Sequence, residues 1–417
     1  MSGLLLAAAS LDVTPPPGHP LDGYAARTGP AAGTADPLRA TLIWLSSEDS
    51  PGVLWLSLDA IAAGTSLAAE LAAAAAAAAD IPEACVVVCA SHTHSGPAGW
   101  TGEIHPVIPA AREPSLYEPL IAAVAHASLR RSPVRAYWRT VEIDGVGTNR
   151  HRCDGPHDNT AGVLALHSLD GSLAAMLLDF ACHPTAYGPE NLLWSADWPG
   201  AARAALGDVV VGYLQGAAGD VSPRFTRRGR GAAEVSRLGG LLAAQVRDAL
   251  GGPGLELPSV APSIRRTTAV LRVRDLPSPA EAAATVASAE AGIRGRLDDP
   301  AARIAQTRLD GARGQALMAA AELPPELELR LSVVTLGDVA WVHLPVELFA
   351  LHGLRLQAVS GYPITRVIGY ADGYFGYVVD AEADAAGVYE ALITYFDQST
   401  TEELLTTAGA LLRTMEA

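Results

Sequence analysis

Hydrophobic and polar positions form a repeating pattern along the first hundred residues. Two apolar runs, residues 40–45 and 53–58, flank a polar turn and have the length and composition of β-strands. Alanine, leucine and one glutamate then fill residues 66–79, which predicts a helix that Pro82 closes. A third apolar run covers residues 85–89. Strand, helix and strand in this order predict a layered α/β fold.

Further along the chain, polar residues stand where apolar runs end. A run at residues 173–181 ends near His183, and one at 339–344 leads to Glu347. Another run, at 209–214, precedes a Gly-Asp-Val-Ser-Pro motif. Sites in α/β proteins lie beyond the carboxyl ends of strands, so this recurrence predicts one shared pocket. We expect an α/β fold of mixed β-sheets flanked by helices.

Residues 278–321 differ from the rest of the chain. They are rich in alanine and arginine, and Pro279 stands at a plausible helix start. We predict a helical insertion here, within a single domain that spans residues 1–417.

Composition excludes several functional classes. All 29 basic residues are arginine, so the chain has no lysine for a Schiff base, a pyridoxal phosphate anchor or a phosphate-binding loop. A formal net charge of −16 argues against nucleic acid as a partner. The N-terminus lacks a basic segment before its apolar run, and acidic residues or proline interrupt the longest apolar stretch. We therefore expect a cytoplasmic protein with no stable membrane insertion.

Candidate chemistry begins at residues 92–97, which read His-Thr-His-Ser-Gly-Pro directly after an apolar run. In a strand, side chains two apart point the same way, so His92 and His94 would face one spot. They would serve as two nitrogen ligands, or as one ligand and one proton carrier; alternatively, they are packing or surface histidines. Gly96 replaces the aspartate of the metallo-β-lactamase pattern, and the amidohydrolase barrel usually needs a lysine. Metal-dependent hydrolysis of another type is the leading hypothesis.

Several motifs occur in the order seen in one enzyme family. They are His-Thr-His-Ser-Gly-Pro at 92–97, Asn149-Arg150, His183, Gly-Asp-Val-Ser-Pro at 219–223, Pro-Val-Glu-Leu-Phe at 345–349 and Tyr-Phe-Gly-Tyr at 374–377. On these motifs the chain resembles the catalytic domain of the neutral, non-lysosomal ceramidases over nearly its whole length. The resemblance implies the fold of that domain. We expect no C-terminal immunoglobulin-like domain, because the chain stops soon after the last motif.

The resemblance also implies a bound zinc ion, Zn2+. Its ligands would be His92, His183, Glu347 and Tyr377, with a water completing the shell. Imidazole and carboxylate groups suit zinc, and a catalytic zinc needs an open position.

Four further residues match catalytic positions of that family: His94, Arg150, Ser222 and Tyr389. We assign His94 to protonating the leaving amine. Arg150 and Tyr389 would hydrogen-bond the tetrahedral oxyanion or the polar head of the substrate. Ser222 lacks the Gly-x-Ser-x-Gly elbow of a serine nucleophile, so we expect its hydroxyl to bind substrate or water.

Other polar residues are candidates for orienting the metal-bound histidines. His343 lies in the run that leads to Glu347 and is one candidate, although packing is its main expected role. Three aspartates are candidates by the same argument, with solvated or capping roles as the alternative. These aspartates are Asp59, Asp197 and Asp220.

The predicted substrate is a small-molecule N-acyl amide, ceramide-like or smaller and soluble. Pro184, Val346 and Asp372 depart from the usual residues of the family, which keeps the ligands but changes the walls of the site. High alanine, glycine and arginine content fits a GC-rich bacterial genome and a role in secondary metabolism. A zinc-dependent esterase or lactonase, an amide-forming or cyclising enzyme, and a non-catalytic ligand-binding protein are the alternatives. Oligomeric state is not predicted.

Overall fold

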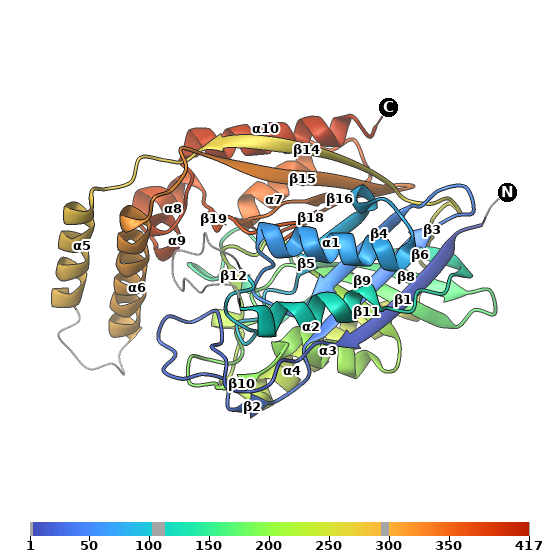
Figure 1. Cartoon of the computed structure of the whole chain (residues 1–417), viewed down its shortest axis with the longest axis horizontal. Helices are drawn as coiled ribbons and strands as arrows, with labels where there is room; N and C mark the ends of the chain where they lie inside the picture. Colours follow the sequence, from blue (N-terminus) through green and yellow to red (C-terminus); the bar gives the residue numbers. More distant parts are fainter. Residues whose placement is uncertain (1–2, 102–112, 293–299, 417) are drawn as a thin grey trace.

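The computed structural model describes residues 3–101, 113–292 and 300–416. Figure 1 shows β-strands at the centre, helices around them and one pair of helices extending from one end of the body. The alternation of strands and helices predicted for the first hundred residues is confirmed. Strands Arg39–Ser46 (β3) and Val53–Leu58 (β4), helix Thr65–Ala79 (α1) and strand Val86–Ala90 (β5) follow one another.

The largest sheet within the described residues has nine strands. Its order is β11-β9-β8-β6-β1-β3-β4-β5, and β13 pairs with β6. The pairs β4/β5 and β9/β11 are parallel. The bounds not yet given are β1 (Leu5–Asp12), β6 (Ser132–Glu142), β8 (Thr160–Ser168), β9 (Leu173–Phe180), β11 (Val210–Gln215) and β13 (Leu255–Glu256).

A second sheet has the order β14-β15-β16-β18, with β16 and β18 parallel. Its strands are β14 (Ser263–Arg272), β15 (Glu326–Leu336), β16 (Val339–His343) and β18 (Ile364–Ile368). Three short ladders complete the strands that the structure describes. They join β2 (Gly33–Thr34) to β10 (Leu193–Trp194), β7 (Thr148–Asn149) to β12 (Val221–Ser222), and β17 (Glu347–Leu348) to β19 (Tyr377–Val378).

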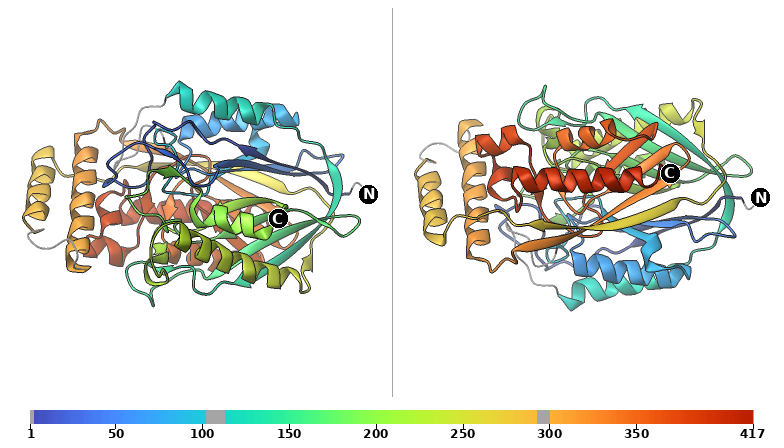
Figure 2. Two further views of the ribbon diagram at one scale, coloured as in Figure 1. Left: turned by 90° about the horizontal axis from the view of Figure 1, so that it is seen from below. Right: turned by 90° about the horizontal axis from the view of Figure 1, so that it is seen from above.

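Helices cover the outer faces of the sheets (Figure 2). Helices α1 and α2 (Pro114–Ala125) pack on β3, β4 and β5, and their apolar side chains form one buried cluster with these strands. Helices α3 (Asp197–Leu206) and α4 (Ala232–Leu250) pack on β8, β9 and β11. The second sheet is covered by α7 (Ala350–Ala358) and α10 (Gln398–Arg413). Two short helices, α8 (Ala381–Ala386) and α9 (Tyr389–Leu392), precede α10.

The inner faces of the sheets share one core. The indole of Trp341 on β16 lies 5.9 Å from that of Trp55 on β4 and 5.5 Å from that of Trp138 on β6, measured between ring centroids. Edge-on aromatic packing of this kind adds to the burial of apolar area. This core joins the second sheet to both halves of the large sheet, so segments that follow β5, β9 and β16 meet at one end of the molecule.

The stretch predicted as a helical insertion contains α5 (Pro279–Gly292) and α6 (Pro300–Ala320). Residues 293–299 of this prediction lie outside the described residues. Helix α6 packs against both α5 and α9, and Leu309 and Ala312 on it are buried. This helix pair therefore contacts the rest of the described structure next to Tyr389.

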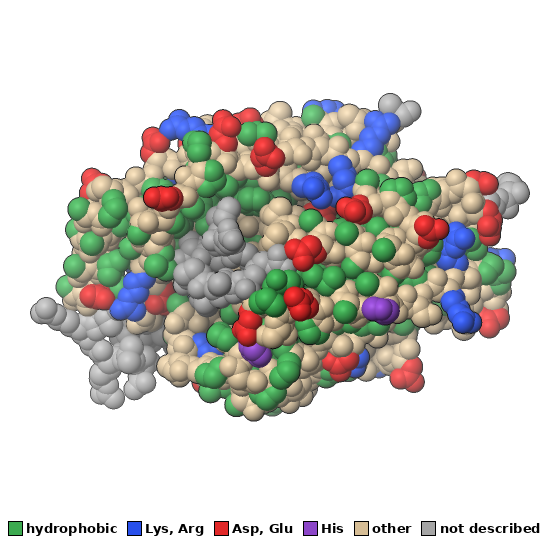
Figure 3. Space-filling model, viewed as in Figure 1, with side chains coloured by type: hydrophobic (Ala, Val, Ile, Leu, Met, Phe, Trp, Pro, Cys, Tyr) green, Lys and Arg blue, Asp and Glu red, His purple; other side chains and the backbone are tan. Residues whose placement is uncertain are grey.

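Charged side chains of both signs are interspersed on the face shown in Figure 3. Within the described residues, none of the helices has the length and apolar character that a membrane span requires.

Candidate metal centre

His92 and His94 stand on a turn that follows β5. The strand ends at Ala90, and His92 has a left-handed backbone with φ of 65°. The imidazole rings of the two histidines are perpendicular, with centroids 4.9 Å apart. The prediction that strand alternation brings them together is therefore wrong. The segment after the strand does so, with His92 in the left-handed conformation.

Three imidazoles have the same anchor. In each, Nδ1 faces a backbone carbonyl oxygen, which only accepts hydrogen bonds, so Nδ1 carries the proton and Nε2 keeps a lone pair. The pairs are His92 with Ile61 at 2.8 Å, His94 with Gly23 at 2.8 Å and His183 with Ala218 at 2.7 Å.

The free Nε2 atoms converge on one point. Those of His92, His94 and His183 lie within 4.8 Å of one another, and the first two are 3.3 Å apart. Oε2 of Glu347 lies 3.2 Å from Nε2 of His92 and 3.2 Å from Nε2 of His183. Lone pairs and a carboxylate packed this closely repel one another unless a cation lies between them. The donor set of imidazole nitrogens and one carboxylate oxygen fits a divalent metal.

The pKa values of the clustered side chains also favour metal binding. Burial, with the neighbouring charges of His92 and His183, lowers the pKa of His94 well below its usual value. Burial and the charge of Arg150 lower the pKa of His183 to about 4. Near neutral pH, His94 and His183 are thus neutral imidazoles, which is the form that binds metal.

Three tyrosines surround Glu347. Tyr377 pairs with it in the parallel ladder of β17 and β19. The hydroxyl of Tyr374 donates to Oε1 of Glu347, and that of Tyr370 donates to Oε2 at 3.3 Å. Sequence reasoning singled out Tyr377 and missed the other two. Both stand a few residues before Tyr377 in the sequence, and this proximity could have marked them as candidate site residues.

Arg150 lies beside the histidine cluster. Its Nε donates to Oε1 of Glu390 at 2.6 Å, and one terminal nitrogen lies 3.2 Å from Nε2 of His183. A guanidinium only donates, which agrees with a lone pair on that Nε2. Arg150 also hydrogen-bonds the side chain of Tyr377 and lies 5.6 Å from its ring centroid. Glu390 was not predicted, although it directly follows Tyr389.

Tyr389 and Ser222 are the two remaining residues that were predicted to be catalytic, and they make different contacts. Tyr389 begins α9, and its ring centroid is 6.2 Å from that of Tyr377. Burial raises the pKa of Tyr389 far above its usual value, so its hydroxyl stays protonated and can donate. Ser222 is buried, but its hydroxyl accepts a hydrogen bond from the backbone N–H of Arg224 and caps a short 3₁₀ helix.

The predicted orienting residues do not hold the histidines, because backbone carbonyls take that role. Asp59 pairs with Arg203, and Nε2 of His343 accepts a hydrogen bond from Trp55. Asp197 and Asp220 bind backbone N–H groups of other segments. Of the roles expected for these four residues, orienting the clustered histidines is therefore wrong.

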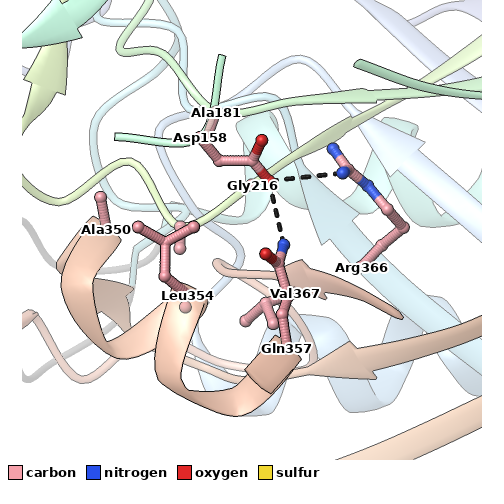
Figure 4. A pocket seen from close by; sticks show the side chains of 10 residues that line it. Asp158, Ala181, Gly216, Ala350, Leu354, Gln357, Arg366 and Val367 are labelled. Atoms are coloured by element: carbon pink, nitrogen blue, oxygen red, sulfur yellow. Dashed lines mark hydrogen bonds and ion pairs between the residues drawn. The ribbon is translucent and has the colours of Figure 1, made fainter. Parts of the chain in front are cut away.

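A small pocket beside α7 is separate from the histidine cluster. Within it, Asp158 accepts hydrogen bonds from Gln357 at 2.9 Å and Arg366 at 3.3 Å (Figure 4). None of the clustered histidines or tyrosines lines this pocket.

Comparison with known proteins identifies the fold. No protein-family model matches this chain, and no curated protein sequence does. Among solved structures, the neutral ceramidase from Pseudomonas aeruginosa is similar with a TM-score of 0.79 and 17% identity, over 100% of this chain and 75% of that chain. A ceramidase complexed with C2 is similar with a TM-score of 0.77 and 16% identity, over 100% of this chain and 76% of that one. This chain has a neutral ceramidase-like fold, as its motifs predicted.

Proposed function

We propose that this chain is a zinc-dependent hydrolase of a linear N-acyl amide, ceramide-like or smaller. The observation that carries the proposal is the convergence of the Nε2 atoms of His92, His94 and His183 beside the Glu347 carboxylate, with each Nδ1 fixed by a carbonyl. The fold shared with solved ceramidases supports amide hydrolysis as the reaction class.

His92, His183, Glu347 and Tyr377 would hold the zinc. Zinc there would polarise the scissile carbonyl and supply a water acidic enough to attack near neutral pH. Nε2 of His94 would accept a proton and would then protonate the leaving amine. Anchoring by Gly23 keeps Nε2 directed at the cluster during both transfers.

Arg150 and Tyr389 would act on the substrate oxygen. Glu390 and Tyr377 raise the pKa of Arg150 well above its ordinary value despite burial, so the guanidinium stays charged. A fixed cation and a phenolic donor stabilise the negative charge that develops in the tetrahedral transition state. Ser222 would offer its hydroxyl hydrogen to substrate or water, since its oxygen already accepts from Arg224.

Metal analysis of wild type and His183→Ala, with a screen of N-acyl amides before and after chelation, tests the proposal. We expect about one zinc per chain and chelator-sensitive amide cleavage, both lost in the variant. Each amide is paired with the ester of the same acyl group. Cleavage of the esters with no cleavage of any amide would replace the amidase by an esterase. A folded wild type without zinc would remove the metal from the mechanism. Location in the cytoplasm and a role in bacterial secondary metabolism stay predictions.

A further inference from the structure

Tyr370 contacts two of the proposed metal ligands at once. Its ring lies against the imidazole of His92, with centroids 4.1 Å apart and planes 30° apart. Its hydroxyl donates to Oε2 of Glu347, the same oxygen that faces Nε2 of His92 and His183. Tyr370 is 1% exposed, so water does not compete for these contacts.

The backbone of Tyr370 joins the same two segments. Its carbonyl accepts from the N–H of Ala90, the last residue of β5, at 3.0 Å. Its own N–H donates to the carbonyl of Val346, the residue before Glu347, at 3.3 Å. The segment that carries His92 and the segment that carries Glu347 are thus both hydrogen-bonded to this one residue.

Tyr370 makes these contacts from a left-handed backbone with φ of 56°. Bulky residues rarely adopt this conformation, which glycine adopts without strain. Glycine would keep both backbone hydrogen bonds but would lose the ring and the hydroxyl. The strained tyrosine therefore indicates a use for its side chain.

We infer that Tyr370 is a positioning residue of the metal centre, which holds the Glu347 carboxylate against His92 and His183. This inference rests on the proposed function. Without the Tyr370 hydroxyl, the carboxylate keeps the Tyr374 donor at Oε1 but loses the donor that holds Oε2 beside the two imidazoles. Partners of this kind orient metal ligands, and their loss typically weakens metal binding by on the order of 10- to 100-fold.

The test compares Tyr370→Phe with Tyr362→Phe in the full chain. Both variants lose one phenolic hydroxyl, and that of Tyr362 donates to the Met415 carbonyl outside the site. Zinc affinity of the metal-free protein is measured by competition with a chelator, and the visible spectrum is recorded with cobalt in place of zinc. We expect Tyr370→Phe to bind zinc on the order of 10-fold or more weakly, with a changed cobalt spectrum. Tyr362→Phe keeps both wild-type values.

Unchanged zinc affinity and an unchanged cobalt spectrum in Tyr370→Phe would overturn the role of Tyr370 and leave the proposed function standing. A wild type that binds neither metal would overturn both. Tyr370→Leu, which also removes the ring from His92, should bind zinc more weakly than Tyr370→Phe. Urea unfolding of the metal-free variants separates loss of the site from loss of the fold.

Discussion

Arg150 and Glu390 form a buried ion pair beside the histidine cluster, with Nε donating to Oε1 at 2.6 Å across 240 residues of sequence. The carboxylate is 2% exposed, and the guanidinium also reaches Nε2 of His183 and the side chain of Tyr377. One residue that was predicted and one that was missed thus act as a unit. The carboxylate fixes the orientation of the cation that would meet the substrate oxygen.

This pair makes stability depend on pH. Burial would raise the pKa of Glu390, but Arg150 and His151 lower it from 4.5 to about 2. A carboxyl pKa that folding lowers contributes stability that is fully present above 4.5 and is lost as the pH falls through about 2. The shift corresponds to about 3 kcal/mol at neutral pH. We expect Glu390→Gln to lose that amount at pH 7, and the difference from wild type to shrink as the pH falls, in urea unfolding over a pH series.

Glu402→Gln is the matched control for this prediction. Glu402 pairs with Arg355 at the surface, where the carboxylate is 54% exposed. Exposed pairs contribute about 0–1 kcal/mol, so the control should stay close to wild type at every pH. Equal losses in the two variants would contradict the role assigned to burial.

Gly23 holds His94 and leaves no room for a side chain. Its φ is 101°, and a Cβ there would lie 2.6 Å from Cβ of His94. Gly23→Ala should displace the imidazole, and displacement of a catalytic group by about 1 Å can reduce turnover on the order of 100-fold. Gly18→Ala meets the same backbone strain, with φ of 104°, but has nothing within 4 Å. Steady-state kinetics of both variants should show a loss of kcat in Gly23→Ala alone.

Gly311 sets the distance between α6 and the helix that carries Tyr389. A Cβ at Gly311 would lie 2.9 Å from Cδ1 of Leu392 and 3.3 Å from Cα of Tyr389. We expect Gly311→Ala to lower kcat by shifting Tyr389, without the usual gain in helix stability. Gly240→Ala in α4 meets nothing within 4 Å and should gain about 1 kcal/mol with unchanged activity. Wild-type kcat in Gly311→Ala would show that α6 does not position Tyr389.

Asp372 lies in the segment that contains Tyr370, Tyr374 and Tyr377, and its carboxylate bonds this segment to β5 and β14. One carboxylate oxygen accepts from the N–H of Val88 at 2.9 Å, and the other accepts from Arg266 at 2.5 Å. Asp372→Asn would place an amide NH2 against the guanidinium or against the N–H of Val88. We expect a loss of about 1.5–3 kcal/mol in thermal or urea unfolding, as for hydrogen bonds to charged groups. Asp275→Asn, at a 92% exposed partner of Arg272, should change stability by less than about 1 kcal/mol.

The sequence predicts the strands, the helices and the candidate histidines because the signals for them are local. Alternating apolar residues, an alanine-rich helix closed by Pro82, and polar residues at strand ends depend on neighbours within a few positions. The order of the motifs also indicated the fold, which solved structures match. Arg150, His183, Glu347 and Tyr377 come from separate segments that the structure brings to one place.

Only the tertiary structure decided how those residues are held. The left-handed turn at His92, the carbonyl anchors of the three imidazoles, and the contacts of Tyr370 and Glu390 join segments far apart in the chain. Such contacts depend on how two sheets pack about Trp341, and local sequence patterns carry no record of that packing. The sequence by itself therefore determined which local elements form and which histidines and motifs to consider as a candidate site. Packing determined which atom of each residue faces the metal position and which partners keep it there.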